Sequence, residues 1–183
     1  MRPNSDLLDL LLEVQHLDRI PRLGYLLSGI SDPESVTEHT WHVAFLVWVL
    51  SEDISDIDRL RALEIAMVHD LAELRIGDFP RTASRYLPQG AKQTAEAAAI
   101  EEILAPLSAR MRALWAEYQA GKSREARLVK ACDKLQMMLK VQLYESQGNE
   151  ALRRFWDNSD NFPDGGFSLI ERLFTELKER RSS

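Results

Sequence analysis

The chain of 183 residues contains a single cysteine, Cys132, and this scarcity excludes several kinds of protein. One cysteine cannot form an internal disulfide or a cysteine-rich zinc module, and it suits a reducing compartment, so we expect a cytoplasmic protein. The N-terminal stretch carries acidic residues among its leucines and no small-residue cleavage site. That is not the pattern of a signal peptide.

Long apolar runs and positive charge are also in short supply. The longest apolar stretch, 43–50, has eight residues, whereas a membrane helix needs about 20, so we expect no membrane partner. The formal net charge is −6, and a broad nucleic-acid face would need clustered lysine and arginine. We therefore expect no nucleic acid polymer as a partner, and any anionic substrate must be met by a local group of cations.

Residues that favour β-strands are few. Leu (27) and Ala (18) far outnumber Val (8), Ile (9) and Thr (5), and no stretch alternates apolar and polar residues cleanly. This balance favours helices. The length fits one domain, so we predict a single all-α domain, a helical bundle spanning residues 1–183. The predicted helices are 5–17, 35–51, 57–74, 91–104, 108–120, 123–147 and 167–180, with Ser35, Asp56 and Ser123 as N-caps.

Four polar side chains are expected on largely apolar helix faces: His39, His69, Asp70 and Asp133. Burying an imidazole or a carboxylate without a partner costs about 1 to 3 kcal/mol, so something must satisfy these groups. Two imidazoles and two carboxylates that converge in a helical bundle form a ligand set for one divalent cation such as Mn, Co, Fe, Ni, Zn or Mg. Taken singly, His39 also fits a hydrogen-bonded core histidine, and Asp133 fits a surface pair with Lys134.

Glu73 is a candidate general acid or base. It lies four residues after His69 and three after Asp70, so it shares their helix face without being forced to bind the ion. A carboxyl group in this position beside a metal site can transfer a proton to or from a reacting group.

Three short sequence words give these residues a family context. The words PESVTEHTW (33–41), AMVHDLAE (66–73) and GDFP (77–80) occur in this order. Together they resemble the H…HD…D signature of the HD-domain metal-dependent phosphohydrolases, and the PESVxEH, HDxxE and GDxP words of their 5′-deoxynucleotidase branch, with its YfbR-like and HD-domain-containing-protein-2-like members. The resemblance spans residues 22–144, most of the chain.

The resemblance implies an all-α HD-domain fold and a role for each matching residue. His39, His69, Asp70 and Asp133 would bind one metal ion, and Glu73 would act as the acid or base. The implied reaction is removal of phosphate from nucleoside 5′-monophosphates, with 2′-deoxyribonucleotides favoured.

The substrate side of the implied site rests on four further residues. By resemblance, Arg22 would approach the phosphate and sugar, and Asp78 would read the sugar 3′-hydroxyl. Tyr25 stands where the branch usually has a tryptophan that closes on the sugar. Arg81 is the first of three cations, with Arg85 and Lys92, in the stretch 79–95, which holds no acidic residue. In an acidic protein this local positive charge would attract a phosphate, although a solvated loop is an equally good interpretation.

Other histidines and aromatic residues receive weaker assignments. Trp41 and Trp48 are seven residues apart, which indicates core packing or a subunit interface, and we expect a homodimer. His16 and His42 have no recognisable carboxylate spacing and are assigned no role. Two other functions stay open: hydrolysis of another phosphomonoester or a phosphodiester, and a non-catalytic nucleotide-binding module that contains a metal.

Overall fold

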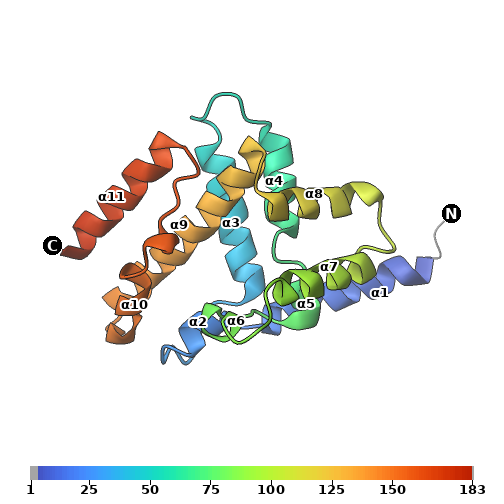
Figure 1. Cartoon of the computed structure of the whole chain (residues 1–183), viewed down its shortest axis with the longest axis horizontal. Coiled ribbons are helices and arrows are strands. Elements are labelled where there is room, and N and C mark those ends of the chain that lie inside the picture. The colour runs from blue at the N-terminus through green and yellow to red at the C-terminus, as the bar shows by residue number, and fades with distance from the viewer. Residues whose placement is uncertain (1–3, 183) are drawn as a thin grey trace.

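The computed structural model describes residues 4–182, without the side chains of residues 4, 5, 81, 84 and 182. The predicted all-α architecture is confirmed: in the described residues the regular structure is helical, apart from one isolated antiparallel bridge between Pro21 and Ser35. The two ends of the chain lie at opposite ends of the long axis (Figure 1).

Seven longer helices build the body of the molecule. They are α1 (Asn4–Val14), α3 (Val36–Leu50), α4 (Arg59–Val68), α7 (Ala91–Ile103), α8 (Ala109–Ala120), α9 (Arg124–Ser146) and α11 (Ser168–Ser182). Short helical turns, which the periodicity of the sequence did not predict, connect them. These are η1 (Gln15–Arg19), α2 (Leu23–Leu26), α5 (Glu73–Ile76), α6 (Arg81–Ser84), η2 (Glu150–Leu152), α10 (Arg153–Trp156) and η3 (Ser159–Asn161).

The N-cap predictions are confirmed at two positions and wrong at one. Ser35 and Glu38 form a reciprocal capping box at the start of α3, and Ser123 caps α9 by accepting a hydrogen bond from the backbone of Ala126. Helix α4 is capped by Asp58 instead of Asp56. Asp56 has a φ of 57°, so it lies in a left-handed turn that cannot begin a helix.

The predicted helix 57–74 is interrupted, and this correction matters for the site. Helix α4 ends at Val68, the chain turns through residues 69–72, and α5 begins at Glu73. Tighter hydrogen bonds replace the helical ladder: Glu73 donates to Asp70 (3.0 Å), and Leu71 donates to Val68 (3.2 Å). The regular helix therefore ends where the two candidate ligands lie, and the Nε2 atom of His69 is 3.3 Å from Oδ2 of Asp70.

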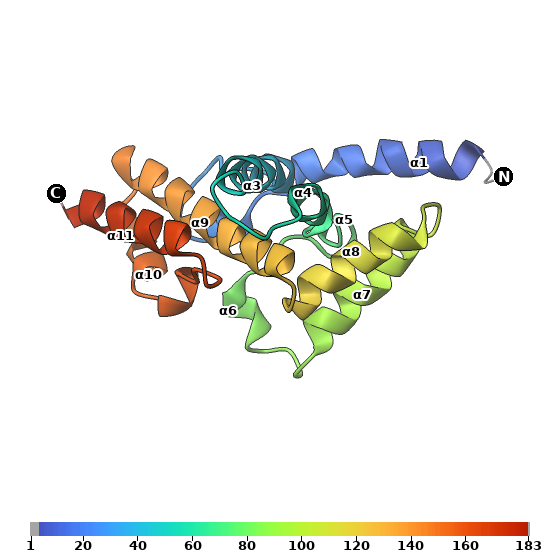
Figure 2. The ribbon, with the colours of Figure 1, turned by 90° about the horizontal axis from the view of Figure 1, so that it is seen from above.

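The core lies where α3, α4 and α9 pack against one another, with α8 beside α4 and α9 and with α11 along the other end of α9 (Figures 1 and 2). Met137 and Met138 are buried there. Trp41 and Trp48 are 60% and 55% exposed, so the core interpretation is wrong for the tryptophans. Across residues 4–182, no helix is both long enough and apolar enough to cross a membrane.

Candidate active site

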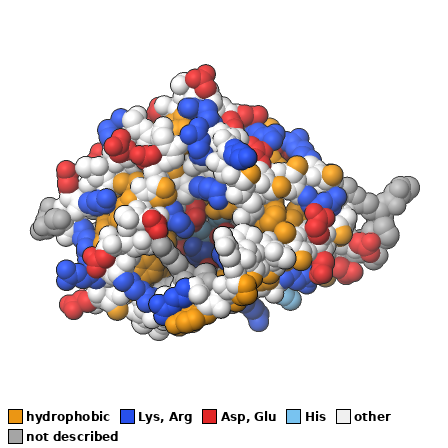
Figure 3. Space-filling model, viewed as in Figure 1, with side chains coloured by type: hydrophobic (Ala, Val, Ile, Leu, Met, Phe, Trp, Pro, Cys, Tyr) orange, Lys and Arg blue, Asp and Glu red, His pale blue; other side chains and the backbone are white. Residues whose placement is uncertain are grey.

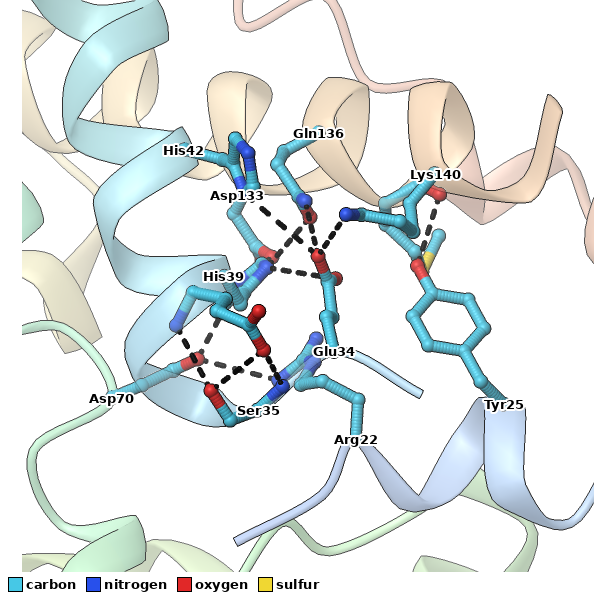
Figure 4. Close-up of polar contacts among 12 residues, drawn as sticks. Arg22, Tyr25, Glu34, Ser35, His39, His42, Asp70, Asp133, Gln136 and Lys140 are labelled. Carbon is cyan, nitrogen blue, oxygen red and sulfur yellow. Dashed lines mark hydrogen bonds and ion pairs between the residues drawn. The ribbon is translucent and has the colours of Figure 1, made fainter. Parts of the chain in front are cut away.

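Three helical elements bring four predicted metal ligands together. His39 comes from α3, His69 and Asp70 from the turn after α4, and Asp133 from the middle of α9. One donor atom from each of His39, His69 and Asp70 lies within 4.8 Å of the other two. The Nε2 atom of His39 is 3.3 Å from Oδ1 of Asp133 and 3.4 Å from Oδ2 of Asp70 (Figure 4).

The two imidazole rings both turn their Nε2 atoms toward this point. His69 Nδ1 lies 2.7 Å from the carbonyl oxygen of Ala66, which can only accept, so this nitrogen carries the proton. His39 Nδ1 lies 2.6 Å from Oε1 of Gln136 and donates to it in the same way. Both Nε2 atoms therefore present lone pairs, and they face each other at 3.4 Å.

This group of lone pairs fits a cation. Two imidazole nitrogens and the carboxylates of Asp70 and Asp133 are all electron-pair donors, and side chains of this kind repel one another unless a positive charge lies between them. Imidazole and carboxylate are ligands that first-row divalent metals accept. The chemistry and burial of the residues are therefore those of a divalent metal site.

The pKa shifts in the cluster report the same electrostatics. Burial alone would raise the pKa of Asp70, but neighbouring His69, His39 and Arg22 hold it well below its usual range. Burial alone would lower the pKa of His69, but the adjacent Asp70 carboxylate raises it. Asp70 thus stays ionised and stabilises positive charge at this position.

Glu73 lies beside the cluster, as its spacing predicted. The residue is 6% exposed, its Oε1 atom is 3.9 Å from Nη1 of Arg22, and its buried Oε2 atom has no hydrogen-bond partner among the described residues. Burial and, after it, the charge of Asp70 raise the pKa of Glu73 well above its ordinary value. A carboxyl group that holds a proton toward neutral pH is suited to proton transfer.

Arg22 and Asp78 form the next layer of the site. Arg22 Nη1 lies 3.3 Å from Oδ2 of Asp70 and 3.3 Å from Oδ1 of Asp78. The carboxylates around it raise the pKa of the Arg22 guanidinium, although burial opposes this. Arg22 therefore supplies a fixed positive charge next to the candidate metal ligands.

A cavity of about 770 Å³ lies over the site. Its lining includes Arg22, His69, Asp70, Glu73, Asp78 and Asp133, whereas His39 is fully buried behind them. Figure 3 shows a hollow on the face of Figure 1, with acidic and histidine side chains inside it and lysine and arginine side chains around it. The cations that line the cavity are Arg22, Arg85, Lys92, Lys130, Lys134 and Arg154. Arg85 and Lys92, two of the three cations in the stretch 79–95, therefore face the cavity. The side chain of the third, Arg81, is not among those that the structure describes.

Tyr25 reaches the cavity wall but is mostly a core residue. It is 2% exposed, its hydroxyl donates to the carbonyl of Met137 (3.0 Å), and its ring packs against Tyr144 and Phe155. Its hydroxyl therefore faces a backbone carbonyl rather than the open cavity.

Some residues around the site were not singled out from the sequence. Gln136 binds His39, Tyr118 packs its ring edge against His69, and Lys130 lies 4.1 Å from the centre of the Tyr118 ring. The spacing of Gln136, three residues after Asp133, was the available signal, because it places both on one face of α9. Tyr118 belongs to α8, and no local pattern links it to the histidines.

Comparisons with known proteins agree with this geometry. A sequence model of the HD domain matches residues 14–162. The mouse (Mus musculus) protein named 5′-deoxynucleotidase HDDC2 is 32% identical over 187 residues, which cover 98% of this chain and 90% of that protein. A conserved hypothetical protein from Pyrococcus furiosus is 36% identical in sequence, with a TM-score of 0.82 over 96% of this chain and 99% of that chain.

A more distant solved structure shares the fold. The HD phosphohydrolase DatZ of cyanophage S-2L, bound to dA and one catalytic Zn²⁺, has a TM-score of 0.55 at 24% identity, covering 92% of this chain and 96% of that chain. From the match of the HD-domain model over most of its length and the near-complete alignment with the curated relatives, this chain belongs to the HD-domain family, in the branch that contains the 5′-deoxynucleotidases HDDC2.

Proposed function

We propose that the protein is a metal-dependent phosphohydrolase that removes phosphate from nucleoside 5′-monophosphates and favours 2′-deoxyribonucleotides. The observation that carries this proposal is the convergence of His39, His69 and Asp70 on one point, with both imidazole Nε2 lone pairs facing inward. An oxygen of Asp133 lies 3.3 Å from the Nε2 atom of His39, at the edge of this group. The names of the curated relatives, which are 5′-deoxynucleotidases, support the substrate class.

Each side chain then has a defined task. A divalent ion held by the four residues would supply Lewis-acid activation of a water nucleophile and offset charge on the phosphate oxygens. Arg22, fixed between Asp70 and Asp78, binds phosphate oxygens. Glu73, whose raised pKa lets it hold a proton, transfers that proton to the leaving alkoxide as the acid, or in its ionised form accepts one from the attacking water.

The remaining residues are assigned to the sugar of the substrate and to the entrance of the cavity. Asp78, which lines the cavity next to Arg22, is assigned to accept a hydrogen bond from the sugar 3′-hydroxyl, as the family resemblance implies. Tyr25 contributes apolar wall, and Arg85 and Lys92 at the cavity draw anionic substrate inward. Arg81 is assigned to the same positive rim because of its position in the sequence.

The ion, the assembly and the location belong to the same proposal. The mixed nitrogen and oxygen donors fit one ion of Mn, Co, Fe, Ni, Zn or Mg. Trp41, Phe45 and Trp48 form a continuous exposed aromatic row on α3, with ring centres 5.5 and 6.0 Å apart, and we assign a second copy of the chain as its cover. The whole length, 1–183, is assigned to one HD domain, and the single buried cysteine suits the cytoplasm.

A panel assay tests the function. The metal-free protein is supplied in turn with Mn, Co, Mg and Zn, and phosphate release is measured from 2′-deoxynucleoside and ribonucleoside 5′-monophosphates, 3′-monophosphates and a phosphodiester. We expect release from 5′-monophosphates, with the deoxy compounds ahead. Turnover of only the phosphodiester or of an unrelated phosphomonoester would favour the other hydrolase function, and binding without turnover under every metal would favour a sensing module.

A further inference from the structure

A chain of buried polar side chains leads away from His39, on the side opposite the candidate metal. Gln136 Oε1 accepts from His39 Nδ1 at 2.6 Å, and Gln136 Nε2 donates to Oε2 of Glu34 at 2.9 Å. The ammonium of Lys140 lies 3.1 Å from the same Glu34 oxygen. Figure 4 shows Gln136 and Lys140 of α9 converging on the carboxylate of Glu34, which precedes α3.

None of the three residues beyond His39 lines the cavity. Gln136 and Glu34 are 3% and 4% exposed, so the network lies within the protein and not in the substrate space. A buried carboxylate and amide are costly to desolvate, and packed apolar side chains would stabilise the same interface at lower cost. This cost indicates that the network has a role other than holding the helices together.

The Glu34 carboxylate determines which groups donate and which accept in the rest of this network. A carboxylate can only accept hydrogen bonds, so the atom of Gln136 that faces Glu34 must be its NH₂ group. The other end of the same amide, Oε1, must then face His39. Since an amide oxygen can only accept, His39 Nδ1 must carry the proton, and its Nε2 atom is left with a lone pair toward Asp70 and Asp133.

The backbone of Glu34 is itself fixed. Its N–H donates to the hydroxyl of Tyr144 at 2.8 Å, and its carbonyl oxygen accepts from the N–H of Arg22 at 2.9 Å. Lys140 compensates the charge of the carboxylate, and the half-exposed His42 has its Nδ1 atom 3.9 Å from Glu34 Oε2. These contacts hold Glu34 in one position, where its carboxylate fixes the orientation of the Gln136 amide group.

His69 offers a built-in comparison. Its Nδ1 proton is held by the backbone carbonyl of Ala66, which no side-chain substitution removes. His39, in contrast, depends on an amide that could rotate by 180° and present NH₂ to the ring. With NH₂ against Nδ1, the imidazole would need its proton on Nε2, where it would block a metal bond.

We propose that Glu34 and Gln136 are positioning residues that fix the metal-binding tautomer of His39, with Lys140 keeping Glu34 in place as a hydrogen-bond acceptor. This proposal rests on the proposed metal site but concerns the protein before any ion binds. The decisive substitution is Glu34→Gln, because it preserves shape and replaces an acceptor-only group by one that can donate. The Gln136 amide is then free to flip.

The first test is ¹⁵N NMR of the histidine rings in the metal-free full chain, at a pH high enough that both rings are neutral. In the wild type we expect the proton on Nδ1 in both His39 and His69. In Glu34→Gln and in Gln136→Leu, His39 gains a population protonated on Nε2, while His69 keeps its Nδ1 proton. The matched control is Glu38→Gln, which removes a negative charge on the same segment but contacts Ser35 and preserves the capping box.

The second test is the dissociation constant for Mn²⁺ and Zn²⁺, measured by calorimetry on the same proteins. Loss of a partner behind a metal-bound histidine weakens metal binding by about 10- to 100-fold, which we expect for Glu34→Gln and Gln136→Leu and not for Glu38→Gln. A wild-type His39 with its proton on Nε2 would overturn the proposal, whether or not the variants fold. Unchanged tautomer and metal affinity in both folded variants would overturn it as well.

These results remain distinct from failure of the proposed function. A wild type that binds no divalent ion, but carries the His39 proton on Nδ1 and loses this preference in Glu34→Gln, would contradict the metal-dependent activity and still support the tautomer control. A metal-dependent enzyme whose His39 tautomer does not change in Glu34→Gln would support the proposed function and contradict the tautomer control.

Discussion

Asp78 contacts both the side chain of Arg22 and the backbone of the residue that follows it. Its Oδ1 atom lies 3.3 Å from Nη1 of the Arg22 guanidinium, and its Oδ2 atom accepts a hydrogen bond of 2.6 Å from the backbone N–H of Leu23, the next residue. The two segments are more than 50 residues apart in sequence. Asp78 therefore fixes both the backbone and the side chain of the arginine assigned to the phosphate, in addition to its assignment at the sugar.

Replacement of Asp78 by Asn tests both assignments. The variant loses a charge-assisted contact with Arg22, a bond of the kind that contributes about 1.5 to 3 kcal/mol, so we expect kcat/KM for 2′-deoxynucleoside 5′-monophosphates to fall about 10- to 100-fold. If Asp78 also reads the 3′-hydroxyl, the preference for 2′-deoxy over 2′,3′-dideoxy substrates should shrink in the variant. An unchanged preference would limit Asp78 to holding Arg22.

Glu73→Gln separates proton transfer from metal binding. Glu73 shares the cavity with the candidate ligands but lies on the Arg22 side of Asp70. The variant should keep the same number of bound ions per chain, measured by elemental analysis, and lose about 10²-fold or more in kcat, the usual effect of a positioned acid or base. Near-normal turnover would remove Glu73 from the reaction, and loss of the ion would make it a ligand.

The raised pKa of Glu73 also predicts a pH-dependent effect on stability. Burial makes the folded protein hold this proton more tightly than the unfolded chain, whose glutamate ionises near pH 4.5. As pH rises above that value, the unfolded chain loses the proton first, so this group progressively lowers the free energy of unfolding. In Glu73→Gln that loss is absent.

Metal-free Glu73→Gln should therefore be as stable as the wild type near pH 4.5 and more stable at pH 7 to 8, by about 1 to 3 kcal/mol, the cost of a buried polar group without a partner. Urea denaturation across this pH range measures the difference. A difference that stays constant with pH, or that decreases as pH rises, would contradict a raised pKa in the folded protein.

The proximity of His39, His69, Asp70 and Asp133 could be predicted from the sequence because the setting of each residue is local. A histidine or aspartate on an otherwise apolar helix face needs a partner, and the motif order supplied a common one. The turn at residues 69–72 could not be predicted in this way, because the apolar periodicity continues through it. The tighter hydrogen bonds that interrupt the helix depend on tertiary packing, which overrides helix propensity.

Contacts between distant segments were also beyond sequence reasoning. From the sequence alone, Gln136 is one polar residue of a long helix, and Glu34 is a residue of the first motif that has no assigned role. In the structure the two side chains meet behind His39. Trp41 and Trp48 show the opposite error. Their spacing marks one face of α3, but periodicity alone cannot tell a face buried in the core from one that is exposed in the isolated chain.

The aromatic row on α3 predicts the effect of surface substitutions on assembly. If a second copy covers Trp41, Phe45 and Trp48, then Trp41→Lys and Trp48→Lys should convert a dimer to a monomer in light scattering at micromolar concentration, because a buried unpaired charge is costly. Leu60→Lys is the matched control, since Leu60 lies on α4, outside the aromatic row, and is 64% exposed. A wild type that is already monomeric would contradict the predicted homodimer.

One titration tests the central claim most directly. A divalent ion is added stepwise to the metal-free protein, and bound ions per chain and phosphate release from a 2′-deoxynucleoside 5′-monophosphate are measured in the same samples. The single cluster of His39, His69 and Asp70, with Asp133 beside His39, predicts that turnover rises in proportion to occupancy and reaches its maximum at one ion per chain. Full turnover without added ion, or a maximum that requires two ions per chain, would contradict it.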